Sequence, residues 1–239
     1  MTRQNGAVRI FLYNWPIYVG TWAVAAVVIA LAPAALGALA AGAIAWSWLS
    51  LLVSHHVYDR SPLALGTWVR RLLPTKVDDW VGIDAGLDAE VALDGVMPGT
   101  CVARLDLYDG DVVRAPSVRR ARATTPRVHA ATATKATSLP LASGSCDVVA
   151  VVFSAHEVHR RTDRDAFFVE LARVLRVGGR VLLVEHLRDL ANFVAFGPGF
   201  LHFLARGEWL RLADHAGLTI AEEIRITPFV MALSLERRA

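Results

Sequence analysis

The chain has 239 residues and a formal net charge of +3, a balance too small by itself to indicate a strongly charged partner. Its two cysteines, Cys101 and Cys146, match no metal or redox motif and provide no disulfide framework, which favours a reduced compartment. Charge is unevenly distributed, because no Asp, Glu, Lys or Arg falls between Arg9 and Asp59. The remainder is long enough for one soluble core.

The charge-free segment from Ile10 to Tyr58 is too long for a single membrane crossing. One helical span needs about 20 residues, because a helix rises about 1.5 Å per residue through a hydrocarbon core about 30 Å thick. Pro33 lies near the middle, where it would interrupt a helix. We therefore predict a membrane hairpin over residues 1–58, with helices at about 11–32 and 34–54. Pro16 suggests that the first helix begins nearer Trp15, since proline is favoured at a first helical position.

Aromatic residues gather at the two ends of the hairpin that would lie side by side, as expected for one membrane interface. They are Tyr13, Trp15, Tyr18 and Trp22 before the turn, and Trp46, Trp48 and Tyr58 after it. Small residues spaced by four would let the helices approach closely, at Gly37 and Ala41 and at Ala38 and Gly42.

Basic residues flank the hairpin on both sides and predict that both of its ends, and the domain that follows, lie in the cytoplasm. They are Arg3, Arg9, Arg60, Arg70, Arg71 and Lys76. We interpret residues 59–77 as a basic juxtamembrane linker. A secretory signal peptide and a hairpin lying within one leaflet are the alternatives.

A second basic segment runs from Val112 to Cys146 without any acidic residue. Its cations are Arg114, Arg119, Arg120, Arg122, Arg127 and Lys135. The segment lacks aromatic residues for base stacking, so we expect no nucleic-acid partner. A nearby membrane favours attraction to anionic lipid headgroups, and a solvated basic loop is the simpler alternative.

Residues 78–239 alternate between expected strands and helices, which predicts a doubly wound α/β domain with ligands at the carboxyl ends of the strands. The expected strands are 81–84, 101–107, 128–134, 147–153, 180–184, 218–226 and 229–235. Helices are expected at 163–175, ending at Gly178-Gly179, and at 208–216, ending at Gly217.

The segment from Leu139 to Gly179 carries motifs that resemble class I S-adenosylmethionine (SAM) dependent methyltransferases, particularly the branch that includes quinone-ring methyltransferases. The matching residues are Leu139-Pro140-Leu141, Gly144-Ser145-Cys146-Asp147, Phe153-Ser154-Ala155-His156-Glu157 and Leu171-Ala172-Arg173-Val174-Leu175-Arg176-Val177-Gly178-Gly179-Arg180. The resemblance covers roughly residues 78–237. It implies a Rossmann-like, mostly parallel sheet of seven strands and SAM as the cofactor.

The resemblance also implies where the cofactor binds. Asp84, Ala85 and Gly86 occupy the frame of the family's acidic and glycine-rich loop, but Asp88 and Glu90 replace its later glycines, and Lys135 stands where an acid is usual. Asp106 ends the second strand, where an acid accepts hydrogen bonds from ribose hydroxyls. Ser154 follows the fourth strand and completes the predicted cofactor site.

Polar side chains follow two strands that should be neighbours. His156 and Glu157 come after one strand, and Glu185 and His186 come after the next. We predict these four as the catalytic group, with a histidine as general base, because the unperturbed imidazole pKa of about 6.5 lies near working pH. Two His and one carboxylate would suffice for a metal, but the spacing matches no metal motif, so no metal is predicted.

The residues after His186 are rich in Phe and Gly, and the family has an insertion here that helps to cover the substrate. We predict that an apolar substrate pocket is lined by Phe193, Phe196, Phe200, His202 and Phe203. Contact of this segment with the bilayer surface, or simple packing against the sheet, are the alternatives.

Together these features predict a membrane-anchored methyltransferase that transfers a methyl group from SAM to a hydrophobic or lipid-soluble acceptor. Quinone-like rings, phospholipid amines and hydrophobic thiols all remain open as acceptors. The departures in the cofactor loop leave two other classes: a non-methylating enzyme on the same fold, with or without a metal at the His and Glu cluster, and a non-catalytic membrane adaptor.

Overall fold

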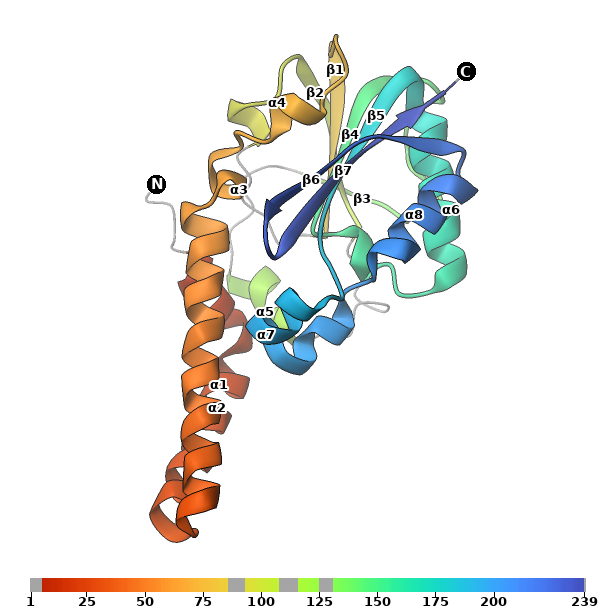
Figure 1. Ribbon diagram of the computed structural model, residues 1–239. Coiled ribbons are helices and arrows are strands. Elements are labelled where there is room, and N and C mark those ends of the chain that lie inside the picture. The colour runs from red at the N-terminus through yellow and green to blue at the C-terminus, as the bar shows by residue number, and fades with distance from the viewer. Residues whose placement is uncertain (1–5, 86–92, 108–115, 125–130, 239) are drawn as a thin grey trace.

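The computed structural model describes residues 6–85, 93–107, 116–124 and 131–238, which form a sheet domain and a long helical hairpin projecting from it (Figure 1). The sheet has seven strands in the order β3-β2-β1-β4-β5-β7-β6. Strands β1 to β5 run parallel to one another, whereas β7 is antiparallel to both β5 and β6. The predicted seven-stranded, mostly parallel sheet is confirmed. The strands are β1 Asp79–Asp84, β2 Thr100–Asp106, β3 Thr132–Ala133, β4 Cys146–Val152, β5 Leu175–His186, β6 Leu218–Thr227 and β7 Val230–Arg237.

The central strands bury side chains on both faces, because successive residues of a strand point to opposite sides. Val149 and Val151 of β4 face a core that includes Phe167 and Phe168 of α6 (Arg161–Val174) and Trp209 of α8 (Arg206–His215). The intervening residues of β4 belong to a second core on the opposite face. The sheet is therefore the middle layer of three.

The second helical layer is built by the segment that follows the hairpin. A π-helical turn η1 (His56–Arg60), α3 (Pro62–Leu65) and α4 (Val69–Leu72) bury Val57, Leu63 and Trp68 against the sheet. Residues 59–77, expected as a linker, thus lie largely inside the fold. Apolar and basic side chains are interspersed in this segment, and the prediction of a linker rested on the basic ones. As a consequence, the end of the hairpin continues without a break into the core of the domain.

The hairpin consists of α1 (Gly6–Leu31) and α2 (Ala34–His55), which pack against each other and turn at Pro33. Both are long and apolar enough to cross a membrane by length and composition. The start of α1 differs from the expectation, because Pro16 lies inside the helix rather than at its first turn. The Asp59 carboxylate accepts hydrogen bonds from the backbone N–H groups of Gly6 (2.6 Å) and Ala7 (3.4 Å), and so satisfies the first turn from outside the helix.

The small residues of the hairpin do not all face the partner helix. A Cβ placed at Gly37 would lie 3.8 Å from the Ile29 Cα, so this glycine does sit at the helix–helix contact. A Cβ at Gly42 would meet no atom within 4 Å, so Gly42 faces outward. The four-residue spacing predicted both, but only the first is confirmed.

Of two further expectations about local structure, one is confirmed in part and the other is wrong. The third strand is limited to Thr132 and Ala133 among the described residues, and positions 125–130 lie outside them. The Gly178-Gly179 pair does not end the helix, since α6 stops at Val174 and both glycines lie within β5. Gly178 has a φ of +77°, which explains the glycine as a bend inside the strand rather than as a helix stop.

Neighbouring residues of α6 provide a test of this packing. Phe168 is fully buried and stacks on Trp209, whereas Val169 is 46% exposed. Replacing Phe168 by Ala should lower the free energy of unfolding by about 3–5 kcal/mol, because a large cavity would remain in the core. Val169→Ala should change it by less than about 0.5 kcal/mol. Chemical denaturation of the detergent-solubilised protein, followed by circular dichroism, measures both, and equal effects would contradict the assigned orientation of α6.

Candidate functional site

The predicted catalytic residues lie at the carboxyl edge of β4 and β5. His156 and Glu157 belong to η3 (Ala155–Glu157) directly after β4, and Glu185 and His186 are the last two residues of β5. All four are buried, with exposed fractions of 8% or less. The structure brings them together but divides them into two groups, one around His156 and one around His186.

The first group is an imidazole between two carboxylates. His156 Nδ1 lies 2.6 Å from Glu185 Oε2, and its Nε2 lies 3.5 Å from Glu157 Oε1. Burial opposes the charged imidazole, but the two carboxylates outweigh it and raise the pKa of His156 to about 10. Glu157 is also buried, yet its contacts with His156 and His202 hold its pKa well below the usual range. His156 is therefore protonated at neutral pH when nothing is bound beside it, and it does not suit the role of general base that was expected for a histidine of this group.

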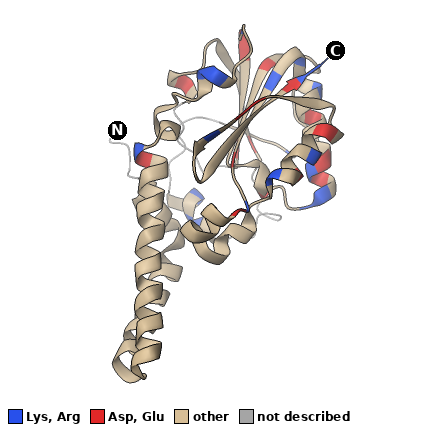
Figure 2. Ribbon diagram, viewed as in Figure 1, with Lys and Arg blue, Asp and Glu red and all other residues tan. Residues whose placement is uncertain are grey.

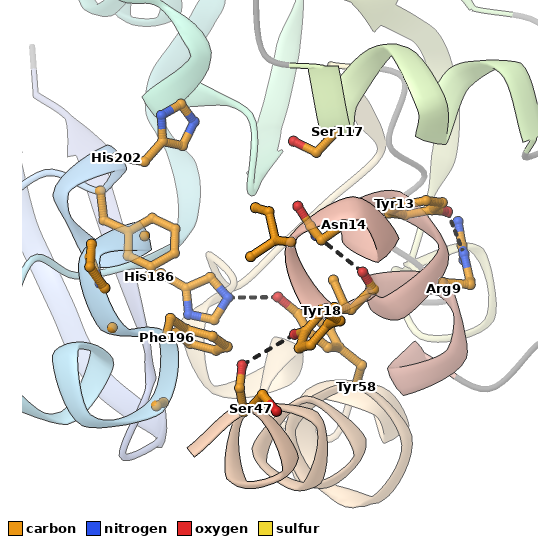
Figure 3. A pocket seen from close by; sticks show the side chains of 18 of the residues that line it. Arg9, Tyr13, Asn14, Tyr18, Ser47, Tyr58, Ser117, His186, Phe196 and His202 are labelled. Carbon is orange, nitrogen blue, oxygen red and sulfur yellow. Dashed lines mark hydrogen bonds between the residues drawn. The ribbon is translucent and has the colours of Figure 1, made fainter. Parts of the chain in front are cut away.

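His186 has the opposite electrostatic state. Burial lowers the pKa of His186 to about 4, so the imidazole is neutral at physiological pH. Its Nδ1 lies 2.9 Å from the Phe229 carbonyl oxygen and therefore carries the proton, which leaves a lone pair on Nε2. The Tyr58 hydroxyl, 2.7 Å away, donates to that Nε2, and the two side chains point toward each other in Figure 3.

Aromatic rings hold His186 in place. It stacks on Phe153 and Phe203, with ring centroids 4.9 Å apart in each case, and Phe196 meets it edge-on at 5.4 Å. Phe153 has a φ of +48°, an uncommon backbone conformation for a residue with a side chain. Such conformations cluster at functional sites, where the surroundings impose them.

Both groups open onto one cavity of about 790 Å³ between the hairpin and the sheet edge (Figure 3). The domain contributes Phe153, His156, Glu157, His186 and residues of the segment that follows α7 (Leu190–Phe196). Helices α1 and α2 contribute the opposite wall, with residues such as Ile10, Tyr13, Asn14, Ile17, Thr21, Ala43, Trp46 and Ser47. Glu185 does not line the cavity, because it lies behind His156 and accepts the Ala155 backbone N–H at 2.9 Å.

The predicted substrate-pocket residues are divided between two places. Phe196, His202 and Phe203 line the cavity. Phe193 packs edge-on against Trp46 of the hairpin, with ring centroids 5.8 Å apart, and Phe200 packs against Phe193. The Phe-rich segment, formed by α7 and η4 (Gly197–His202), therefore both walls the cavity and attaches the domain to α2. A hydrogen bond from Trp46 Nε1 to the Val194 carbonyl, 2.6 Å long, strengthens that attachment.

The predicted cofactor residues lie beside this cavity, at the ends of β1, β2 and β4. Asp84 and Asp106 are paired neighbours at the ends of β1 and β2, Ala85 is buried, and Ser154 donates to the Ile83 carbonyl at 3.1 Å. Gly86, Asp88 and Glu90 lie outside the described residues. These positions provide the small residue and the buried acid that a nucleoside requires at such an edge.

The Asp106 carboxylate is paired with Arg122 of α5 (Pro116–Thr124). Arg122 Nη1 and Nη2 lie 3.2 Å and 2.9 Å from the two carboxylate oxygens, and Nη1 also donates to the Ala85 carbonyl. Arg120 on the same helix donates to the Tyr13 carbonyl of α1 at 2.6 Å. Two cations of the basic segment are therefore used inside the fold rather than offered to lipid headgroups. Arg114 and Arg127 lie outside the described residues.

Some site residues were not predicted from the sequence. Tyr58 was interpreted only as an interfacial aromatic, Arg122 only as part of a basic segment, and the hairpin only as an anchor. Each depends on a contact between residues far apart in the chain: Tyr58 with His186, Arg122 with Asp106, and α1 with α5. The one available signal was the position of Tyr58 just beyond the charge-free segment, where the chain returns to the domain.

Comparisons with known proteins agree with this geometry. Residues 100–183, from β2 into β5, match the family model of a methyltransferase domain. No curated protein matches the chain.

Among solved structures, a SAM-dependent methyltransferase from Aquifex aeolicus is 13% identical, with a TM-score of 0.55, covering 80% of this chain and 98% of that one. Geranyl diphosphate C-methyltransferase from Streptomyces coelicolor A3(2), solved with Mg²⁺, geranyl diphosphate and S-adenosyl-L-homocysteine, is 16% identical, with a TM-score of 0.53 and coverages of 78% and 82%. The complex between the Haloferax volcanii Trm112 methyltransferase activator and its putative methyltransferase gives 16% identity, a TM-score of 0.53 and coverages of 81% and 97%. At these identities the structures show a shared fold.

The methyltransferase-domain match over residues 100–183 and the shared fold support the expected enzyme class, a SAM-dependent methyltransferase, and SAM as its cofactor.

Proposed function

We propose that this methyltransferase is anchored in a membrane by its hairpin and methylates an apolar acceptor that enters the cavity between the hairpin and the sheet edge. One observation carries the proposal: α1 and α2 form a wall of the same cavity that contains His156 and His186. An anchor that only held the enzyme at a surface would not need to line the site. An acceptor dissolved in the bilayer would meet the cavity at the wall that the hairpin provides.

The exposure of the hairpin supports a membrane location. In the most apolar 18-residue stretch of each helix, only 11% of the residues in the first helix and none in the second are buried in the fold. Neither is therefore a core helix of a soluble protein. Large apolar side chains such as Val24 (65% exposed), Val27 (58%) and Leu39 (72%) face outward. Figure 2 shows that the projecting part of the hairpin carries no charged residue, whereas charges cover the sheet domain. Exposing so much apolar surface to water is unfavourable, and a bilayer removes that cost.

The aromatic residues of the hairpin and the apolar residues beside them also support a membrane location. Trp22 stacks on Trp48, with ring centroids 5.4 Å apart, and donates a hydrogen bond to Ser47 Oγ at 2.6 Å. Leu190 and Leu201 on the neighbouring Phe-rich segment are 75% and 57% exposed. Tryptophan is favoured at membrane interfaces, and the exposed leucines beside it would be stabilised by contact with lipid. With basic residues flanking the hairpin, the domain would lie on the cytoplasmic side.

The chemistry around His186 favours an acceptor with an acidic hydroxyl, such as a phenol or quinol carrying an apolar substituent. SAM supplies an electrophilic methyl group when bound. The acceptor hydroxyl must lose its proton as its oxygen is methylated, and the neutral His186 Nε2 can take that proton directly or through the Tyr58 hydroxyl. The Phe229 carbonyl, bonded to Nδ1, would stabilise the imidazolium that forms. The surrounding rings exclude water and align the acceptor ring.

The cofactor end of the site would be held by Asp84, Ala85, Asp106 and Ser154. Cavity-lining Phe153 directly precedes Ser154, and α5 contributes Ser117 to the cavity and Arg122 to Asp106. The acceptor and cofactor positions are therefore neighbours. Ribose hydroxyls would share the Asp106 carboxylate with Arg122 or displace the guanidinium from it.

The membrane topology is testable by cysteine labelling. In a background lacking Cys101 and Cys146, a cysteine replacing Ala34 at the turn should react with a membrane-impermeant maleimide added to intact cells. A cysteine replacing Arg60 at the domain end should react only after lysis, because it would lie in the cytoplasm. Labelling of Arg60→Cys but not of Ala34→Cys in intact cells would contradict the orientation, and labelling of neither after lysis would indicate a buried hairpin.

The cofactor assignment predicts that Asp106→Ala weakens SAM binding by about 1–3 kcal/mol, since a buried acceptor is lost. Asp78→Ala, which removes an exposed acid before β1 at the opposite edge of the sheet, should leave the affinity unchanged. Calorimetric titration of the detergent-solubilised protein with SAM measures both variants. Equal affinities for Asp106→Ala and wild type would remove Asp106 from the site.

The proton-transfer assignment predicts the pH dependence of methyl transfer. Only neutral imidazole accepts a proton, so activity should rise with pH through the lowered pKa of His186, about 4, and stay level between pH 6 and 8. Replacing His186 by Ala should reduce turnover about 10²–10⁴-fold with little change in SAM affinity. Tyr58→Phe, which keeps the ring and removes the hydroxyl, separates relay from direct transfer. A profile that rises only above pH 6.5 would assign the base to another group.

A further inference from the structure

Three potential metal ligands converge on the domain side of the cavity, in the group around His156. The side-chain ligand atoms of His156, Glu157 and His202 all lie within 4.8 Å of one another. Glu157 Oε1 is 3.5 Å from His156 Nε2 and 3.2 Å from His202 Nε2. Atoms bound to one tetrahedral ion at about 2.0–2.1 Å are separated by roughly 3.3–3.4 Å, so the two distances from Glu157 already fit, and the two imidazoles need only a small movement toward each other.

Glu157 also has an oxygen that the fold leaves without a partner. Its Oε2 is buried and accepts no hydrogen bond from any residue that the structure describes, although the side chain is only 4% exposed. A buried carboxylate oxygen without a donor is costly and calls for a ligand, since most buried polar atoms are paired. A cation held by both oxygens of Glu157, beside the two imidazoles, would satisfy it.

Glu185 holds His156 in the orientation that a metal requires. Its Oε2 accepts from His156 Nδ1 at 2.6 Å, and its Oε1 accepts the backbone N–H of Ala155 at 2.9 Å, so the carboxylate is fixed from two sides. With the proton on Nδ1, the lone pair of Nε2 is directed at Glu157 and His202. A carboxylate behind the ligating imidazole is a regular feature of metal sites, where it fixes the tautomer and raises the basicity of the ligand.

Charge balance points the same way. Glu157 and Glu185 are 5% and 0% exposed, and both carboxylates belong to the same buried cluster. Buried charges need compensation, and a divalent cation would neutralise both carboxylates while leaving both imidazoles neutral.

We propose that His156, Glu157 and His202 bind a divalent transition-metal ion, with Glu185 as the residue that positions His156. Two imidazoles and one carboxylate suit Zn²⁺ or Fe²⁺ better than Mg²⁺ or Ca²⁺, which prefer oxygen ligands. All three ligands line the cavity, so the remaining coordination positions face the space for the acceptor. Three protein ligands and an open position characterise catalytic rather than structural sites.

The ion would polarise an acceptor oxygen and so ease the loss of its proton to His186. This role rests on the proposed function, whereas metal binding itself does not. The site combines residues of η3 and η4, with β5 behind them, and none of its sequence spacings forms a metal motif.

The test uses the tag-free full chain in detergent, stripped with a chelator and titrated with Co²⁺, whose visible absorption reports coordination by protein ligands. Wild type should bind one equivalent of Co²⁺, lose the absorption when Zn²⁺ is added, and retain Zn²⁺ after desalting. His202→Ala and Glu157→Gln should abolish the absorption. Glu185→Gln should weaken metal affinity about 10–100-fold without abolishing binding, because it acts through His156.

His215→Ala, which removes an exposed histidine at the end of α8, is the matched control and should bind like wild type. SAM titration of the same samples verifies folding and separates the two proposals. A protein that binds SAM but neither Co²⁺ nor Zn²⁺, or a His202→Ala variant that binds metal like wild type, would overturn the metal site. Metal binding without methylation of any apolar phenol would leave the metal site standing and contradict the proposed acceptor.

Discussion

The hydrogen bond between Tyr58 and His186 joins the two parts of this molecule. Tyr58 belongs to the π-helical turn that ends the hairpin, and His186 ends strand β5. The bond is 2.7 Å long and lies among stacked rings, so it fixes the imidazole and the end of α2 relative to each other. The cavity exists because of this junction: without the hairpin, the polar groups at the sheet edge would face solvent on that side.

The electrostatics of the edge follow from what each histidine meets. His186 is surrounded by aromatic rings and a carbonyl, so burial dominates and the imidazole is neutral. His156 lies between two carboxylates, so their charge dominates over burial. Two histidines at the same edge of one sheet therefore have different chemistry. The neutral one suits proton acceptance, and the one flanked by carboxylates suits either a fixed charge or a cation that replaces its proton.

Helix α5 connects the other components. Arg122 reaches the acid at the end of β2, Arg120 reaches the backbone of α1, and Ser117 borders the cavity. A nucleoside that displaced Arg122 from Asp106 would therefore act on the same helix that holds the hairpin through Arg120. The segment whose charge suggested lipid headgroups is a bridge between the cofactor edge and the apolar wall.

The sequence was a good guide wherever a local pattern determined the result. The Val-rich run of β4, the turn at Pro33 and the polar pairs after β4 and β5 each produced the predicted element or juxtaposition, because burial and proline geometry act within a few residues. It was a poor guide where contacts between residues far apart in the chain determine the local structure. Asp59 caps the first turn of α1 at Gly6, so the helix begins well before Pro16, and Gly178 bends a strand whose neighbours hold it. The partners of Tyr58, Arg122 and Glu157 required the whole fold.

The central claim is that the hairpin forms part of the acceptor site rather than only an anchor. A cavity-filling substitution on the hairpin tests it most directly: Ala43→Trp on α2 lies on the cavity wall, whereas Gly42→Trp on the adjacent, outward position does not. Methyl transfer from SAM to an apolar phenol should be measured for both in lipid nanodiscs, together with SAM affinity. The account predicts that Ala43→Trp loses turnover while keeping its SAM affinity and that Gly42→Trp behaves like wild type. Full turnover in Ala43→Trp would contradict it.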